Sequence, residues 1–143
     1  MNVLGVDPGG TTGWALIVTR GEHSLRDIRF IAAGEIGAGL EDWKAGLDYL
    51  KELNLDYLFA ESVVVHGQLN RNKTHQIAVA DRITFWAYMN GIPFKWITPE
   101  HRKRSLKAIP YVPKGYGTHA RDAFAVAVAG ALKEADEWKK KSL

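Results

Sequence analysis

One decapeptide near the start of the chain, residues 4–13, reads Leu-Gly-Val-Asp-Pro-Gly-Gly-Thr-Thr-Gly. The apolar run over residues 2–6 predicts a buried strand, and Pro8 with the two glycines after it predicts a tight turn. Asp7 then stands at the carboxyl end of a strand, the edge at which open α/β sheets bind ligands. The glycines allow a phosphate to approach the backbone closely. The alternative is that Asp7 only caps the turn.

The hydrophobic pattern outward from this strand predicts alternating strands and helices. We expect strands over 14–19 and 28–36 joined by a hairpin connection at 21–24, a helix over 40–53, a strand over 55–61, a loop over 62–73, a helix over 74–90, a strand over 92–97, a helix from Thr98-Pro99, a loop over 108–117, and a last helix from Thr118 to residue 138. The strand over 55–61 follows a helix, which favours a parallel crossover. This order predicts an α/β fold with a mixed five-stranded sheet flanked by helices, in one domain over residues 1–143.

Composition limits the chemistry that the chain can support. The 143 residues are 46% hydrophobic and 24% charged, enough to bury a core, and they include no cysteine. A disulfide framework and thiolate metal sites are therefore excluded, so any metal must be held by carboxylates and histidines, which favours Mg²⁺ or Mn²⁺. No uncharged apolar stretch reaches about 18 residues, so we expect no membrane span. The N-terminus leads directly into a strand pattern, and we expect the protein to work in the cytoplasm.

Basic residues are concentrated in two segments, although the formal net charge is only +3. The first segment follows Glu61 and contains Arg71, Lys73 and His75. The second runs from Thr98 to Arg121 and contains Arg102, Lys103, Arg104, Lys107, Lys114 and Arg121. Basic segments near acidic residues suit a polyanionic substrate that is held around a metal centre. The alternative is that each segment is simply a solvated surface.

Two further acids stand where a charge needs a partner. Glu61 ends the apolar run Leu-Phe-Ala at 58–60, and a charge beside such a strand is costly if it is dry and unpaired. Asp122 lies in a helix of small apolar residues and requires a cation or a metal. His119 is three residues earlier, on the same helix face. The alternatives are an ordinary surface glutamate at 61 and a pairing of Asp122 with Arg121, although adjacent helical residues point in different directions.

These side chains could converge on one point. Three clustered carboxylates repel one another unless a divalent cation neutralises them. Two such ions about 4 Å apart can activate a water and stabilise the leaving oxygen in phosphodiester cleavage. The pattern therefore predicts a metal-dependent nuclease site at Asp7, Glu61, His119 and Asp122, with flanking phosphates held by the basic segments.

Three segments resemble, in order, the motifs of RuvC-type Holliday junction resolvases: 5–9 (Gly-Val-Asp-Pro-Gly), 60–63 (Ala-Glu-Ser-Val) and 119–123 (His-Ala-Arg-Asp-Ala). The similarity spans nearly the whole chain. It implies a ribonuclease-H-like fold, a homodimer with dimer contacts from the helix over 74–90, and paired nicks in opposed strands of a four-way DNA junction that leave 5′-phosphate and 3′-hydroxyl ends. It also implies that Asp7, Glu61 and Asp122 bind two Mg²⁺ or Mn²⁺ ions, and that His119 binds metal or positions the attacking water.

The chain departs from the family pattern in two places. Many members carry an aromatic residue shortly after the second acid, where Val63-Val64-Val65 stands here. The basic segment before the last motif is also shorter than in typical bacterial members. The first departure leaves the residue that opens the junction unidentified. The second is shared by compact, phage-encoded relatives, which can have broader specificity for branched DNA.

Other functions remain open at this point. A nuclease of the same fold could act on RNA–DNA hybrids or flaps. Residues 7–13 also resemble the first phosphate loop of actin-like ATPases and sugar kinases, but those proteins bind nucleotide between two lobes, each about as large as this whole chain. A binding module without catalysis is disfavoured, because a pure DNA binder gains nothing from carboxylates near phosphate.

Overall fold

The structure is a computed structural model that describes residues 1–20, 28–37, 39–63, 67–108 and 114–142, without the side chains at 40, 108 and 137–142. The hairpin connection expected at 21–24, two of the valines after Glu61 and part of the loop expected over 108–117 lie outside the described residues. None of the helices in the described part of the chain is both long and apolar enough to cross a membrane.

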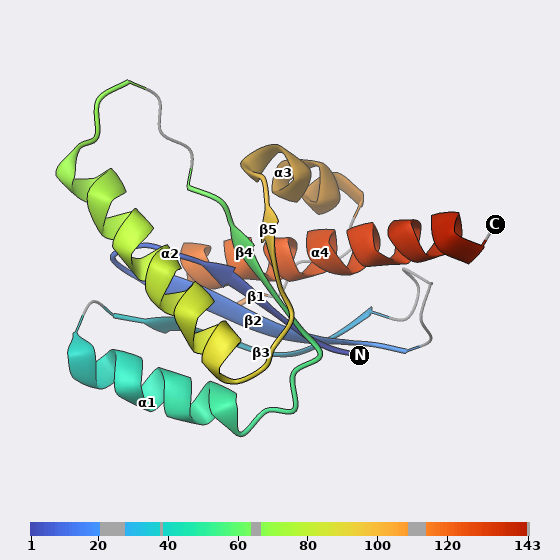
Figure 1. Ribbon diagram of the computed structural model, residues 1–143, viewed down its shortest axis with the longest axis horizontal. Helices are drawn as coiled ribbons and strands as arrows, with labels where there is room; N and C mark the ends of the chain where they lie inside the picture. Colours follow the sequence, from blue (N-terminus) through green and yellow to red (C-terminus); the bar gives the residue numbers. More distant parts are fainter. Residues whose placement is uncertain (21–27, 38, 64–66, 109–113, 143) are drawn as a thin grey trace.

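A five-stranded mixed sheet forms the centre of the fold (Figure 1). Its strands are β1 (Asn2–Asp7), β2 (Thr12–Thr19), β3 (Ile28–Ile36), β4 (Tyr57–Glu61) and β5 (Phe94–Ile97), in the spatial order β3-β2-β1-β4-β5. β1, β2 and β3 pair antiparallel, whereas β4 and β5 continue the sheet parallel to β1. The predicted mixed sheet and parallel crossover are confirmed.

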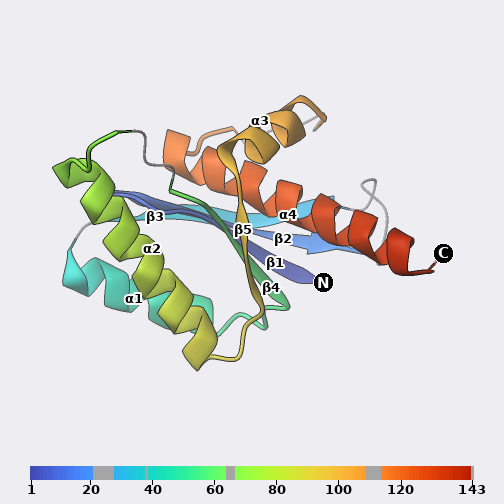
Figure 2. The ribbon, with the colours of Figure 1, turned by 45° about the horizontal axis from the view of Figure 1, so that its top comes forward.

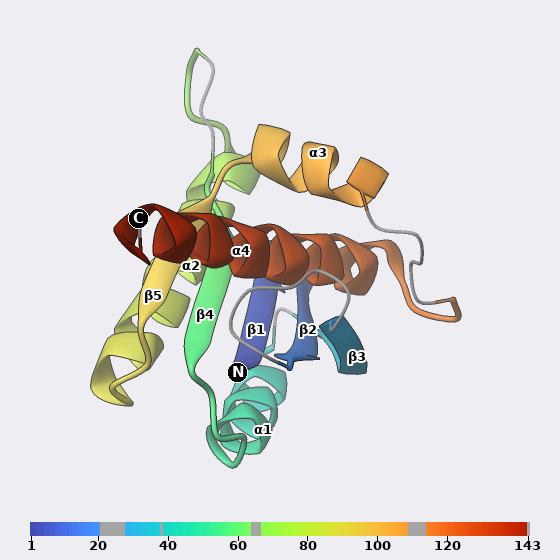
Figure 3. The ribbon, with the colours of Figure 1, turned by 90° about the vertical axis from the view of Figure 1, so that its right-hand side faces the viewer.

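Helices cover both faces of the sheet. They are α1 (Leu40–Lys51), α2 (Arg71–Met89), α3 (Pro99–Ala108) and α4 (Thr118–Ser142). α1 and α2 lie on one face, and α4 crosses the strands on the other with α3 packed against it (Figures 2 and 3).

The alternation of side chains along the strands assigns each core residue to one of these faces. Val3 and Phe59 pack under α4, together with Ala123 and Ala127 of that helix. Their neighbours along the strands, Leu4 and Leu58 among them, pack instead against α1 and α2. Asp7 follows Val6 at the end of β1, and Glu61 follows Ala60 at the end of β4. Both acids therefore fall on the α4 face of the sheet.

α4 lies against the backbone of the sheet itself. A Cβ atom added at Gly5 would come within 2.2 Å of the Ala123 carbonyl oxygen, and one added at Gly13 within 1.9 Å of the His119 carbonyl oxygen. Only glycine leaves room for the helix backbone at these two positions. The contact fixes the first turns of α4 over the carboxyl end of β1.

The predicted start of the second helix was wrong. α2 begins at Arg71, three residues before the predicted residue 74. Asn70 caps it, because its side-chain oxygen accepts a hydrogen bond from the Lys73 backbone N–H at 2.8 Å. Arg71 and Lys73 thus stand on the first helical turn rather than in a loop. Smaller shifts move other ends: α1 ends at Lys51, β4 begins at Tyr57, and α4 continues to Ser142.

Candidate active site

The fold brings the four predicted site residues to one place. Asp7 ends β1 and Glu61 ends β4, and these strands are parallel neighbours with Val6 opposite Ala60. The next residue on each strand is the acid, so both carboxylates leave the same edge of the sheet on the same face. His119 and Asp122 lie in the first turns of α4, which packs over that edge.

His119 and Asp7 are in direct contact. The His119 Nδ1 atom lies 3.4 Å from Asp7 Oδ2, a hydrogen bond whose direction depends on the histidine tautomer. The Asp7 side chain is only 18% exposed, whereas that of His119 is 47% exposed. The histidine is therefore the solvent-facing member of the pair.

Arg102 occupies a place that the sequence did not predict. Its Nε atom lies 3.1 Å from Glu61 Oε2, and its Nη1 atom donates a hydrogen bond of 3.2 Å to Asp122 Oδ1. The side chain is 14% exposed, so it is an interior cation between two acids rather than one of the exposed DNA-binding groups predicted for its segment.

Local structure explains how α3 presents this arginine. β5 ends at Ile97, and the Thr98 hydroxyl oxygen accepts a hydrogen bond from the His101 backbone N–H at 3.2 Å, which caps the new helix. Arg102 follows one turn later and donates its backbone N–H to the Thr98 carbonyl. The sequence predicted that a helix starts at Thr98-Pro99. It did not predict that the first turn of this helix directs Arg102 toward the acids.

The site is electrostatically coupled. Burial raises the pKa of Asp7, the Asp122 charge adds to the rise, and the hydrogen bond from His119 and the Arg102 charge oppose it. Burial likewise raises the pKa of Glu61, the Asp7 and Asp122 charges add to the rise, and Arg102 opposes it. Each of these two carboxyls responds to the other members of the group, so the acids form one cluster.

The donor set suits a hard divalent cation in its chemistry, because carboxylate oxygens and an imidazole are ligands that Mg²⁺ and Mn²⁺ accept. Across the described residues, however, no three acidic or histidine side chains are gathered tightly enough to hold an ion as they stand. Arg102, which contacts both Glu61 and Asp122, neutralises part of the cluster in this arrangement. The predicted ligands are thus assembled as neighbours but are not converged.

Basic side chains lie on several elements that also carry or adjoin the site residues. Arg71, Lys73 and His75 line a cavity of about 570 Å³ beside Gly10, which is in the turn that follows Asp7. Lys103, Arg104 and Lys107 are exposed on α3, and Lys114 is exposed just before α4. Apart from Arg102, the residues predicted to bind DNA are therefore accessible, or nearly so, to a ligand at the site.

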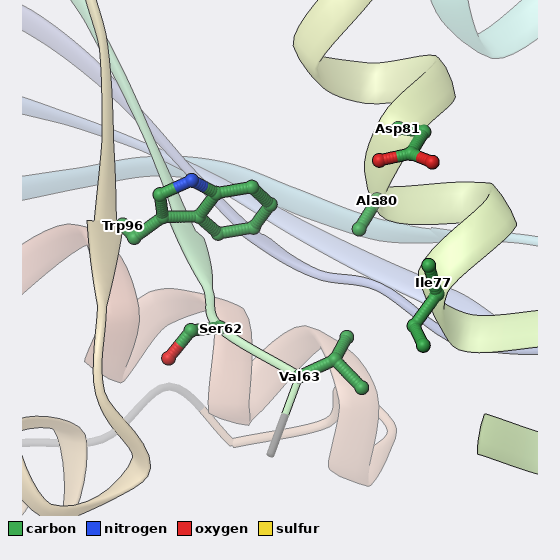
Figure 4. Close-up of a pocket in the computed structure, with 6 residues that line it drawn as sticks. All are labelled: Ser62, Val63, Ile77, Ala80, Asp81 and Trp96. Atoms are coloured by element: carbon green, nitrogen blue, oxygen red, sulfur yellow. The ribbon is translucent and has the colours of Figure 1, made fainter. Parts of the chain in front are cut away.

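An apolar pocket that the sequence reading missed lies on the opposite face of the sheet. Its volume is about 330 Å³, and it is lined by Ser62, Val63, Ile77, Ala80, Asp81 and Trp96. Figure 4 shows the Trp96 ring directed from β5 toward α2. Trp96 and buried Ile97 are adjacent on β5, so their side chains point to opposite faces of the sheet. This alternation is what the sequence offers to place Trp96 on the face opposite Ile97.

Neither the family models nor the curated protein sequences match the chain. Its structure is similar to RuvC of Thermus thermophilus, with a TM-score of 0.76 and 17% identity over 96% of this chain and 97% of that one. The same protein in complex with a Holliday junction substrate gives a TM-score of 0.74 at 17% identity, with 96% of each chain covered. The Fowlpox virus resolvase bound to its substrate Holliday junction DNA gives 0.61 at 13% identity, over 92% of this chain and 99% of that one. The chain therefore has the RuvC-type, ribonuclease-H-like fold that its three motifs predicted.

Proposed function

We propose that this protein is a metal-dependent DNA endonuclease that resolves Holliday junctions and related branched DNA. The observation that carries the proposal is the arrangement of Asp7, Glu61 and Asp122, from β1, β4 and α4. Arg102 contacts Glu61 and Asp122 at 3.1 Å and 3.2 Å, and His119 of α4 contacts Asp7 at 3.4 Å. Two of the similar structures are of resolvases bound to Holliday junction DNA, which supports the choice of substrate. The cuts would be paired nicks in opposed strands that leave 5′-phosphate and 3′-hydroxyl ends.

Asp7, Glu61 and Asp122 would hold the metal, proposed as two Mg²⁺ or Mn²⁺ ions. Bound in this way, divalent cations would lower the pKa of an attacking water and stabilise the leaving oxygen. His119 is anchored through Nδ1 to Asp7, so the opposite edge of its ring, which carries Nε2, faces away from that acid. The ring would then bind metal or position the attacking water.

Basic residues that are exposed or, in the case of Lys73, half-buried would bind the DNA backbone near the cluster. They are Arg71, Lys73, Lys103, Arg104, Lys107 and Lys114. Arg71 and Lys73 line a cavity beside Gly10, which is close in the chain to Asp7, and this supports a role for them in phosphate binding. Binding of this kind weakens with rising salt, because each neutralised phosphate releases counterions.

We also propose that the protein acts as a homodimer through α2. Phe85, Tyr88 and Met89 of α2 are 65%, 80% and 63% exposed, an unusual concentration of large apolar side chains on one helix. Ile77, Asp81, Phe85 and Met89 follow one another at four-residue spacing, so this surface reaches the apolar pocket beside Trp96 past the carboxylate of Asp81. A second copy would bury the stripe and supply the second active site that paired nicks require.

The dimer is testable by sedimentation at micromolar concentration. Phe85→Glu combined with Tyr88→Glu should give a monomer that still binds Mn²⁺, whereas exchange of the exposed Arg104 for Gln should leave the dimer intact. A wild-type protein that sediments as a monomer in the presence of junction DNA would contradict the dimer.

The activity is tested by offering the protein a four-way junction, a flap, an RNA–DNA hybrid and plain duplex, each with Mg²⁺ or with chelator. We expect symmetrical nicks in the junction, only with metal, and ligatable ends. Asp122→Asn serves as the matched inactive protein and should still bind the junction. Preferential cleavage of the hybrid or the flap would replace the proposed substrate, and no metal-supported scission of any substrate would end the proposal.

A further inference from the structure

The acid cluster contains its own buried cation. Arg102 contacts Glu61 and Asp122 at 3.1 Å and 3.2 Å, and the exposed fraction of its side chain is 14%. It comes from α3, whereas the acids come from two strands and from α4. Without Arg102, partly buried carboxylates would face one another, and among the described residues His119 beside Asp7 would remain to offset their charge.

We propose that Arg102 is the internal counter-ion of the cluster and is exchanged for the divalent cation when the site takes up metal. The inference rests on the proposed function, because it concerns the same acids in their role as metal ligands. It adds that the metal-free site is held together by an arginine, and that metal affinity is set by the competition between the two cations.

The first argument is that one set of oxygens cannot serve both cations. Glu61 and Asp122 are the two acids that Arg102 contacts, and both are proposed ligands. A divalent ion bound to those oxygens would lie within a few ångströms of the guanidinium charge, in a partly buried place where charges are weakly screened. Arg102 must therefore move away for the acids to converge on a metal.

The second argument is the geometry of the contacts that the arginine makes. A permanent arginine–carboxylate pair typically forms two parallel hydrogen bonds to one acid. Here the guanidinium spans two different acids, and its buried Nε has no aligned hydrogen-bond acceptor in the described structure despite the nearby Glu61 oxygen. This arrangement suits a side chain that balances charge and can leave.

The exchange is tested by titrating the metal-free protein with Mn²⁺ in a calorimeter and by measuring thermal unfolding in chelator. The variants are Arg102→Gln, Arg102→Lys and, as a matched control on the exposed side of the same helix, Arg104→Gln. We expect Arg102→Gln to melt at a lower temperature in chelator, to recover that loss with Mn²⁺, and to bind Mn²⁺ about tenfold more tightly than wild type because a nearby positive charge is gone. Arg104→Gln should match wild type in both measurements.

Unchanged or weaker Mn²⁺ binding by folded Arg102→Gln would overturn the exchange, since an arginine with a merely structural role gives that result. If Arg102→Gln does not fold even with Mn²⁺, the lysine variant decides. A lysine keeps the positive charge but carries one nitrogen where the arginine presents two, Nε to Glu61 and Nη1 to Asp122. Arg102→Lys should therefore hold the two acids less firmly and bind Mn²⁺ more tightly than wild type, and equal or weaker binding refutes the proposal. The two proposals fail in different ways. If the wild type binds Mn²⁺ and cuts junctions but Arg102→Gln binds Mn²⁺ with the same affinity as wild type, only the exchange is refuted. Failure of the wild type to bind Mn²⁺ or cut any DNA refutes the function on which it rests.

Discussion

Replacing Gly5 with alanine should separate α4 from β1 and with it break up the acid cluster. The new Cβ would lie 2.2 Å from the Ala123 carbonyl oxygen and 2.5 Å from the Ala127 backbone nitrogen, whereas ordinary contacts begin near 3.4 Å. Both obstacles are backbone atoms, which cannot rotate aside, so the helix must withdraw by about 1 Å in a core that has no free volume. Asp122 immediately precedes Ala123 in the chain and is carried away from Asp7 with it.

The expected cost follows from known overpacking of protein cores. Such substitutions cost about 1–3 kcal/mol, and a clash with helix backbone belongs at the upper end. For a chain of this length, a loss of about 3 kcal/mol lowers the melting temperature by roughly 12 °C. Junction cleavage, measured well below the new melting temperature, should fall by at least about 100-fold, because a displacement of about 1 Å in catalytic geometry has an effect of that size.

Calorimetry and a single-turnover cleavage assay check the two parts separately. Gly10→Ala is the matched control, because it adds the same atom three residues after Asp7 and meets nothing closer than 4.0 Å. A Gly5→Ala protein that melts within about 2 °C of wild type would refute the packing argument. A destabilised variant with normal cleavage would refute the claim that this contact positions the acids.

Three further predictions test the cluster and its surroundings. Asp7→Asn should abolish cutting but retain junction binding, and in chelator at pH 8 it should melt at a higher temperature than wild type. Burial raises the pKa of Asp7, so the stability of the wild type falls as the pH rises above the ordinary pKa of 3.8 and the buried carboxyl ionises. The difference in melting temperature between the two proteins should vanish when the pH is lowered to about 3.8. Equal melting of the two proteins at pH 8 would show that the ionised Asp7 is not destabilising. His119→Ala should slow cleavage by about 10²-fold or more with an altered pH profile, and an unchanged profile would remove the imidazole from the reaction. Lys103→Gln with Arg104→Gln should lower the slope of log affinity against log salt by about 2, and a wild-type slope would return these residues to the solvated-surface interpretation.

Much of the site was predictable because it depends on periodicity. Alternation along two parallel strands puts Asp7 and Glu61 on one face, and a helix of small residues carrying Asp122 predicts close packing over that face. The alternation and the small-residue pattern can each be read from a short stretch of sequence. Parallel pairing of the two strands then brings their ends together. The ordered motifs then predicted the fold.

The role of Arg102 could not be predicted in the same way. In the sequence it is one of several basic residues on a helix, and only the rotation of α3 against α4 distinguishes it from exposed Lys103 and Arg104. That rotation depends on tertiary packing. For the same reason, the sequence did not predict that the proposed metal ligands stand apart. Spacing along the chain does not show which cation the acids face. The early start of α2 rests on one capping side chain, Asn70, at the end of a segment without hydrophobic periodicity.

Synthesis delivers the last members of the acid cluster late. α4 follows every strand that the structure describes, and it brings both His119 and Asp122. A nascent chain can pair its strands on the ribosome, but the apolar side chains beneath α4, such as Val3 and Phe59, stay uncovered until that helix emerges and docks. Such a chain already carries the basic residues of α2 and α3, so it could adhere to DNA while lacking two of the four proposed catalytic groups. The proposed strand scission would thus begin only with the closing step of folding.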